Sequence, residues 1–235
     1  MSSQQTDPEF RVYMRVENRF DLLQKAVASI PEFHSLLTIV DNSPGGINVE
    51  MPAGVTVWRP PVPLTFSMSH NWWFQEAARM RCRFIIWMHT DAESVDNGHL
   101  RLLEFTRQQI SDGVNWGTIF TSYDTIAAVN LEAIADVGPY DVIFDKYFCD
   151  CCLYRRMRLR GWRTMDTGIY TKHVGSQTIK SDPKLEFLNG QTFELYAAYF
   201  EKKWGGPPGQ ETFDVPFNNS MMRFQDTSPA HYNPA

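Results

Sequence analysis

The apolar run Phe84–Met88 constrains the fold of this chain more than any other segment. Such a run is typical of a strand that is buried on both faces, as in the middle of a parallel sheet. His89, Thr90, Asp91 and Glu93 follow it directly. Ligands of open α/β sheets bind beyond the carboxyl ends of the strands, and oxygen and imidazole groups there suit a divalent cation. Because acidic residues after a strand also cap helices, the spacing alone leaves metal binding and helix capping open.

The segments around this run alternate between strand-like and helix-like patterns. We expect strands at 10–16, 36–40, 55–58, 84–88, 118–121, 125–129 and 167–174. We expect helices at 22–30, 71–81, 99–110, 131–137 and 150–160, and a helical segment from 182 that breaks at 189–190 and resumes over 192–203. The order strand, helix, strand, strand, helix, strand in the first half predicts an α/β fold with a largely parallel sheet.

Composition narrows the class of protein. The 235 residues, 43% of them hydrophobic and 21% charged, suit one α/β domain with elaborations or two small ones. The net charge of -5 argues against a dominant nucleic-acid-binding surface, although the basic residues within 155–163 leave nucleic acid open as a partner. No apolar run approaches the roughly 20 residues that span a bilayer, and residues 1–9 lack the apolar core of a signal peptide. We therefore expect a soluble, cytoplasmic protein without a membrane span.

The cysteines do not form a recognisable metal site. Cys149, Cys151 and Cys152 lie close together, and only Cys82 lies elsewhere. Cys149 and Cys152 form a Cys-x-x-Cys pair, but a zinc site of that type needs a second pair. We therefore expect buried, reduced thiols.

Common nucleotide-binding and hydrolase motifs are missing from the sequence. No Gly-x-Gly-x-x-Gly follows a predicted strand, and neither a Walker A loop nor a Gly-x-Ser-x-Gly elbow occurs. The acidic and histidine residues at the ends of predicted strands remain as the candidates for chemistry.

Several short segments match the motifs of one enzyme family in order and spacing. They are Val16-Glu17-Asn18-Arg19, Ile39-Val40-Asp41-Asn42-Ser43, Ser69-His70-Asn71, Met88-His89-Thr90-Asp91-Ala92-Glu93, Gly138-Pro139-Tyr140-Asp141, Tyr147-Phe148-Cys149-Asp150-Cys151-Cys152-Leu153-Tyr154-Arg155, Lys172-His173-Val174-Gly175 and Lys202-Lys203-Trp204-Gly205-Gly206. Together they make residues 12–217 resemble the GT-A-fold glycosyltransferases of the large family 2 type.

This resemblance implies a GT-A fold, in which helices flank a Rossmann-like central sheet that is mixed and mostly parallel. It implies one catalytic domain over residues 1–204 and a Gly/Pro/Asn-rich tail over 205–235. The implied activity is the transfer of a sugar from a nucleotide-diphosphate sugar, with a UDP-sugar favoured, to a hydroxyl acceptor such as a glycan. The implied reaction depends on Mn²⁺ or Mg²⁺ and inverts the anomeric configuration.

The resemblance also implies the metal-binding residues. Asp91 falls on the Asp-x-Asp motif of the family, and His173 matches a late histidine that completes the metal shell. His89 occupies the first position of that motif, and Glu93 is a second-choice ligand or a helix cap. A histidine in the ligand set favours Mn²⁺ slightly over Mg²⁺.

The remaining implied site residues bind the donor or act as the base. The donor-binding residues are Asn18, Arg19, Asp41, Asn71, Thr90 and Arg155. Asp41 would contact the nucleotide base, and Arg155 would reach phosphate. Asp150 is the general base, because the start of a helix favours an ionised carboxylate that accepts the proton of the acceptor hydroxyl. A simple N-cap is the other role open to Asp150.

This chain departs from the family pattern at three positions. His89 replaces an aspartate, and Cys149 and Cys152 replace acidic residues on either side of Asp150. The loss of carboxylates favours, as one alternative, a catalytically inactive sugar- or nucleotide-binding module of the same fold. A second alternative is a transferase that glycosylates hydroxymethylated nucleic acid bases. A nucleotidyltransferase would need a glycine-rich loop after the first strand, and Glu17-Asn18-Arg19 offers none.

Overall fold

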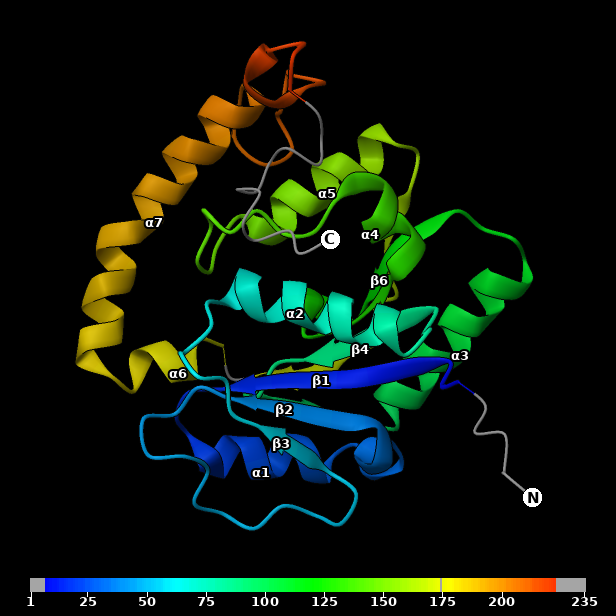
Figure 1. The fold of residues 1–235 in the computed structure, drawn as a ribbon, viewed down its shortest axis with the longest axis vertical. Coiled ribbons are helices and arrows are strands. Elements are labelled where there is room, and N and C mark those ends of the chain that lie inside the picture. The colour runs from blue at the N-terminus through cyan, green and yellow to red at the C-terminus, as the bar shows by residue number, and fades with distance from the viewer. Residues whose placement is uncertain (1–6, 174, 223–235) are drawn as a thin grey trace.

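The computed structural model describes residues 7–173 and 175–222, and a seven-stranded sheet with the order β3-β2-β1-β4-β7-β6-β8 forms its centre (Figure 1). The strands are β1 (Phe10–Val16), β2 (Leu37–Asp41), β3 (Thr56–Trp58), β4 (Phe84–Met88), β6 (Trp116–Phe120), β7 (Ile126–Asn130) and β8 (Arg163–Asp166). Neighbouring strands are parallel except around β7, which runs antiparallel to β4 and β6. A separate antiparallel pair joins β5 (Ala92–Ser94) to β9 (Thr171–His173). The predicted mixed, mostly parallel sheet is confirmed.

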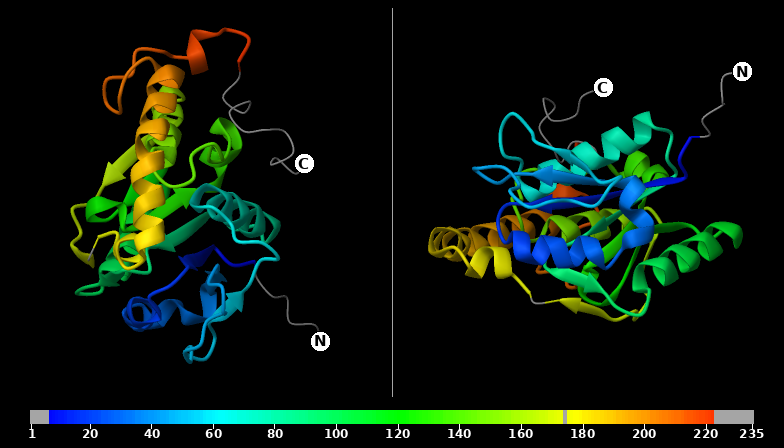
Figure 2. Two further views of the ribbon diagram at one scale, coloured as in Figure 1. Left: turned by 90° about the vertical axis from the view of Figure 1, so that its left-hand side faces the viewer. Right: turned by 90° about the horizontal axis from the view of Figure 1, so that it is seen from below.

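Helices cover both faces of the sheet (Figure 1 and Figure 2). They are α1 (Phe20–Ala28), α2 (Phe66–Arg79), α3 (Gly98–Ser111), α4 (Leu131–Val137), α5 (Cys149–Leu159), α6 (Gln177–Lys180) and α7 (Pro183–Trp204), with 3-10 turns η1 (Pro31–Leu36), η2 (Ser122–Asp124) and η3 (Pro216–Asn218). Buried side chains of α1, η1 and α3 form one core cluster, and those of α2, α4, α5 and the end of α7 form the other. Within the described ranges, no helix combines the length and apolarity that crossing a bilayer requires.

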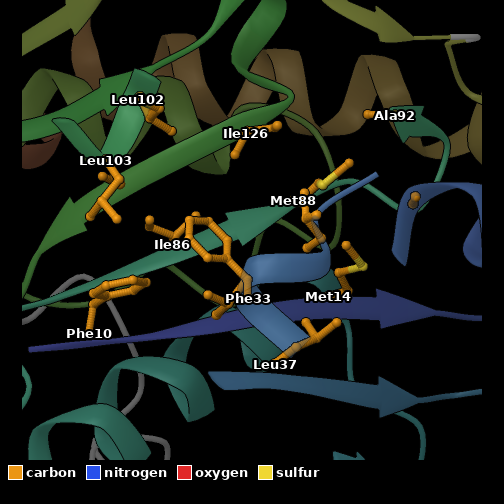
Figure 3. Packing of buried hydrophobic residues seen from close by; sticks show 14 of the residues in the cluster. Phe10, Met14, Phe33, Leu37, Ile86, Met88, Ala92, Leu102, Leu103 and Ile126 are labelled. Carbon is orange, nitrogen blue, oxygen red and sulfur yellow. The ribbon is translucent and has the colours of Figure 1, made fainter. Parts of the chain in front are cut away.

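Strand β4 lies between these two clusters. Phe84, Ile86 and Met88 belong to the first cluster, where Figure 3 shows Ile86 and Met88. Ile85 and Trp87 point the other way, into the second cluster. None of the five side chains is more than 2% exposed, which confirms a strand buried on both faces. The polar residues that follow β4 therefore start from a rigid support.

Helix α7 runs without interruption over 22 residues. The predicted break at Asn189-Gly190 is therefore wrong. Asp182 caps the helix by accepting hydrogen bonds from the amides of Lys184 and Leu185. An interior glycine costs only about 1 kcal/mol relative to alanine, so this cap and the other helix-forming residues keep the helix intact.

Helix α2 begins earlier than the sequence pattern predicts. Its first residue is Phe66, whereas the predicted start is Asn71. The Thr65 hydroxyl accepts a hydrogen bond from the amide of Met68 and caps the extra turn. The earlier start brings Phe66 to the wall of the cavity described below.

The strand predicted over 167–174 is confirmed only over Thr171–His173, which form β9, and residues 167–170 form no strand. Strand β8 ends at Asp166, whose side chain accepts a hydrogen bond from the amide of Gly168 at 2.8 Å. Gly168 has a φ of 65°, a left-handed conformation that glycine adopts without steric cost. This turn separates β8 from β9, and the two strands belong to different sheets. The last predicted strand residue, Val174, lies outside the described residues.

The segment after α7 folds back on α5. Gly205 ends α7 in a left-handed conformation with a φ of 76°. The Arg155 guanidinium then donates a hydrogen bond of 2.8 Å to the carbonyl of Phe213. The predicted division between domain and tail after residue 204 stays a prediction, and residues 223–235 lie outside the described part of the chain.

Candidate active site

A cavity of about 320 Å³ lies beyond the carboxyl ends of β1 and β4, at the edge where the sequence predicts a ligand site. Its polar lining includes His89, Thr90, Asp91, Asp124, Asp150 and His173. These residues come from the end of β4, the turn η2, the first turn of α5 and strand β9. Segments far apart in the sequence thus contribute carboxyl and imidazole groups to one space.

Asp91 and His173 lie in contact at the wall of this cavity. His173 Nε2 lies 3.2 Å from Asp91 Oδ1, and the amide of Gln177 donates to Asp91 Oδ2 at 3.2 Å. The antiparallel pairing of β5 with β9, in which Ala92 lies opposite His173, produces this contact. Burial opposes the charge of Asp91, but the hydrogen bond from His173 and the nearby imidazole of His89 hold its pKa to about 2. Asp91 is therefore a carboxylate at neutral pH.

His89 provides a second imidazole beside this pair. Its ring stacks on that of His173 with 5.5 Å between the centroids, and it also packs against Phe66 and Trp87. Desolvation by these neighbours lowers the pKa of His89 to about 4, against a smaller opposite effect of Asp91. The imidazole is therefore neutral at physiological pH, which is the form that ligates metals.

The metal-ligating atoms present suit a divalent cation that takes only part of its coordination shell from the protein. Asp91 Oδ1 and His173 Nε2 face each other, and a ligand set of one carboxylate and one imidazole suits Mn²⁺ slightly better than Mg²⁺. Among the residues the structure describes, no three His, Cys, Asp or Glu side chains are arranged to hold a metal. Two ligating atoms from the protein still suit a cation whose other ligands are diphosphate oxygens and water.

Glu93 lies in a different environment. It belongs to β5, and its Oε1 is 2.8 Å from the Nζ of Lys172 on β9. Helix α3 begins after Asn97, so the predicted role of Glu93 as a helix cap is wrong. Glu93 is absent from the described cavity lining, and its role as a second metal ligand stays a prediction.

Asp150 occupies the first turn of α5 on the opposite wall. The N-cap of this helix is Phe148, with a φ of 67° and no side-chain cap, so the alternative role of Asp150 as the N-cap is wrong. Burial raises the pKa of Asp150, although amides of the first turn partly offset this by favouring its ionised form. The flanking Cys149 and Cys152 are buried free thiols, as expected. Asp150 is thus a carboxyl group with raised proton affinity that faces a cavity, which suits a general base.

Asp124 is a site residue that sequence reasoning missed. It lies in η2 between β6 and β7, and both Tyr123 and Asp124 have left-handed φ values, 61° and 57°. The Tyr154 hydroxyl donates to Asp124 Oδ2, while Oδ1 is buried and has no hydrogen-bond partner within residues 7–173 and 175–222. An aspartate just after the predicted strand 118–121 was the only available signal, and Tyr154 on the adjacent helix α5 completes its environment.

Asn18 and Arg19 lie where β1 ends. Asn18 Nδ2 donates to the carbonyl of Thr178 at 3.2 Å, and its Oδ1 is buried with no hydrogen-bond partner among the residues that the structure describes. Arg19 forms a two-pronged contact with Asp21 at 2.8 and 2.9 Å and reaches Gln177 at 3.4 Å. These contacts tie the predicted donor-binding segment to α6, which forms the adjacent cavity wall.

Two other predicted donor-binding residues lie at the ends of strands. Thr90 lines the cavity, and its hydroxyl is 3.5 Å from the carbonyl of Arg15. Asp41 is 3% exposed, and its carboxylate accepts hydrogen bonds from the amides of Ser43 at 2.9 Å and Ile47 at 3.0 Å. This arrangement stabilises the turn after β2, and contact of Asp41 with a nucleotide base stays a prediction.

The last two predicted donor-binding residues make internal contacts away from the described cavity lining. Asn71 joins α2 to the loop between α4 and α5, because its side chain exchanges hydrogen bonds of 2.8 and 2.9 Å with the backbone of Tyr140. Arg155 holds the segment after α7 through Phe213 and through Asp214 at 3.2 Å. Their roles in donor binding stay predictions.

No protein-family model and no curated protein sequence matches this chain. Its fold is similar to those of solved structures, among them two of S. aureus TarS. A TarS 1–349 structure has a TM-score of 0.51 at 8% identity, covering 69% of this chain and 59% of that one. A longer TarS structure has a TM-score of 0.51 at 8% identity, covering 83% and 43%. This chain therefore spans little more than half of one TarS chain and less than half of the other.

A third similar structure is a Drosophila beta-1,4-galactosyltransferase 7 mutant in complex with manganese, UDP-Gal and xylobiose. Its TM-score is 0.48 at 13% identity, covering 74% of each chain. The TarS matches, together with the mixed sheet and its flanking helices, confirm the predicted GT-A fold. Membership of family 2 stays a prediction.

Proposed function

We propose that this protein is a metal-dependent, inverting glycosyltransferase that moves a sugar from a nucleotide-diphosphate sugar, with a UDP-sugar favoured, to a hydroxyl acceptor. The observation that carries this proposal is the division of chemistry within one cavity. An ionised carboxylate and one imidazole follow β4, a second imidazole comes from β9, and a carboxyl group of raised proton affinity lies on α5. A GT-A fold with such a cavity fits diphosphate on one side and an acceptor on the other.

Asp91 and His173 serve the diphosphate side in this proposal. Asp91 stays ionised far below neutral pH, and His173 Nε2 faces the same space. A divalent cation, when bound there, would neutralise charge that grows on the diphosphate as the glycosidic bond breaks. His89 stays neutral and adds no positive charge that would compete for the carboxylate.

Asp150 serves the acceptor side. Its carboxylate takes the proton of the acceptor hydroxyl while that oxygen forms a bond to the anomeric carbon. The bond from the anomeric carbon to the diphosphate oxygen breaks, and its electron pair leaves with the diphosphate. Attack opposite to the leaving group inverts the anomeric configuration. The raised pKa of Asp150 supports this role, because a base that holds its proton more firmly assists the transfer better.

Nucleotide-sugar binding and turnover test the proposal directly. Thermal shifts of the full chain with UDP and UDP-sugars, with and without Mn²⁺, should show stabilisation that requires both ligand and metal. Donor hydrolysis or transfer should fall by about 10²-fold or more in Asp150→Asn, while Mn²⁺-dependent donor binding remains. Glu104→Asn, an exposed carboxylate change on α3, is the matched control. Failure of every nucleotide sugar to bind in the presence of Mn²⁺ or Mg²⁺ would refute the proposal.

An inactive binding module remains the alternative that one observation favours. Within the described residues, no three-ligand metal cluster is preformed, as expected of a site that has lost carboxylates. Such a module would bind a nucleotide or sugar without turnover, and Asp150→Asn would change nothing. Metal-dependent turnover that disappears in Asp91→Asn decides for the enzyme.

A further inference from the structure

Two carboxyl groups, not one, face the acceptor side of the cavity. Asp150 projects from the first turn of α5, and Asp124 projects from η2 between β6 and β7. Tyr154 lies one helical turn after Asp150 on α5, and its hydroxyl donates to Asp124 Oδ2. Tyr154 therefore links the turn that carries Asp124 to the helix that carries Asp150.

One carboxyl oxygen of Asp124 has no hydrogen-bond partner in the described part of the chain. Its Oδ1 is buried, and among the described residues no group donates to it or accepts from it. A buried polar atom without a hydrogen bond is costly, so such an atom beside a cavity points to a ligand. The backbone supports this view, because Tyr123 and Asp124 both have φ values near +60°, which are rare for an aromatic residue. Strain of this kind is typical of functional sites.

The charges around Asp124 oppose its ionisation. Burial raises the pKa of Asp124 well above its usual range, and Asp150 on α5 and Asp166 on β8 raise it further. The hydrogen bond from Tyr154 acts in the opposite direction but is outweighed. Of the cationic side chains in the cavity lining, Arg15 is paired with Glu17 at 3.0 Å, and Lys146 belongs to the loop before α5.

We propose that Asp124 keeps its proton in the working enzyme and that its carboxyl OH donates a hydrogen bond to an oxygen of the acceptor, while Asp150 is the base. This inference rests on the proposed function. It assigns different tasks to the two carboxyl groups: Asp124 orients a polyhydroxylated acceptor by donation, and Asp150 accepts the proton of the attacking hydroxyl. Tyr154 holds Asp124 Oδ2, which leaves Oδ1 as the oxygen that carries the donated hydrogen.

Two substitutions distinguish a protonated Asp124, which donates a hydrogen bond, from an ionised carboxylate at the same position. Asp124→Asn retains an acceptor for Tyr154 and supplies an NH₂ donor, so kcat/KM should stay within about tenfold of the wild-type value. Asp124→Ala has no donor, and its kcat/KM should be lower than that of Asp124→Asn by about tenfold, mostly through KM for the acceptor. Asp150→Asn should lose about 10²-fold or more in kcat. If Asp124→Asn is as inactive as Asp150→Asn, Asp124 does not act as a hydrogen-bond donor. The same conclusion follows if Asp124→Asn and Asp124→Ala have equal kcat/KM.

A second measurement reads the proton on Asp124 without any substrate. A carboxyl group whose pKa is raised by folding costs more stability as the pH rises above its unfolded value of about 3.9. The Tm of the wild-type protein should therefore decline more between pH 5 and pH 8 than that of Asp124→Asn. Equal slopes would mean that Asp124 is ionised in the folded protein and would overturn the inference. If the Tm slopes of the two proteins differ but the wild-type protein shows no turnover, the proposed function is overturned instead. Failure of the inference and failure of the proposed function are therefore distinguishable.

Discussion

His173 Nε2 lies 3.2 Å from Asp91 Oδ1, and this contact joins the end of β4 to strand β9. The two residues meet because β5 and β9 pair in a small sheet of their own, with Ala92 opposite His173. The contact turns two residues with separate sequence signals into one site. It also lies in the half of the cavity to which we assign metal binding.

Removal of the His173 imidazole should weaken metal-dependent binding of the nucleotide sugar. His173→Ala deletes an imidazole that faces Asp91 Oδ1, so the Mn²⁺ concentration for half-maximal UDP-sugar binding should rise by at least about tenfold. Titration of Mn²⁺ in the thermal-shift assay measures this change. Lys172→Ala, the neighbouring residue on the same strand, is the control and should leave the Mn²⁺ requirement unchanged. An unchanged requirement in His173→Ala would remove this histidine from the metal site.

Asp91 should make stability sensitive to acid. Because folding lowers the pKa of Asp91 to about 2, its ionised form contributes stability that is complete above the unfolded pKa and is lost as the pH falls through the folded one. The wild-type protein should lose on the order of 2 kcal/mol more than Asp91→Asn between pH 5 and pH 2. Urea unfolding at a series of pH values measures the difference. Parallel curves for the two proteins would contradict the prediction.

The buried ion pair between Lys203 and Asp141 should contribute strongly to stability. Both side chains are 0% exposed, and the Tyr199 hydroxyl also donates to Asp141 Oδ2 at 3.1 Å. Lys203→Met leaves a buried carboxylate uncompensated, so the free energy of unfolding should fall by about 3–5 kcal/mol. Lys202→Met, at the exposed neighbouring position of α7, should change it by no more than about 0.5 kcal/mol.

A double variant separates the loss of the pair from the loss of packing. Asp141→Asn added to Lys203→Met removes the remaining charge, so part of the lost stability should return. Urea unfolding of the single and double variants completes the cycle. Additive losses would show that the two charges are not coupled.

Gly190 tests the continuity of α7. The residue is exposed in the helix interior, its φ is helical, and an added Cβ would meet no atom within 4 Å. Gly190→Ala should therefore raise the free energy of unfolding by about 0.5–1 kcal/mol, as measured by urea unfolding. Gly113→Ala is a matched control with equally open space but a φ of 66°, so it should be destabilising. Destabilisation by Gly190→Ala would indicate a break in the helix after all.

The main frame of the fold could be predicted from local patterns. The run Phe84–Met88 shows the apolar continuity of a strand buried on both faces, and the structure places it between two core clusters. The polar residues after the predicted strand 84–88 also indicated that Asp91 lies at the edge of the sheet, where it lines the cavity. These properties depend on side chains close together in the sequence, so periodicity and capping rules suffice to detect them.

Only the tertiary structure decided how distant segments complete the site. The strands β5 and β9 are three residues each, and no local pattern predicts their pairing, which brings His173 to Asp91. Asp124 became a site residue because α5 places Tyr154 and Asp150 beside its turn. Local sequence determined the strand ends and their polar residues. Burial, long-range pairing and neighbouring charge set the protonation states of those residues, because these effects arise only when remote segments exclude water together.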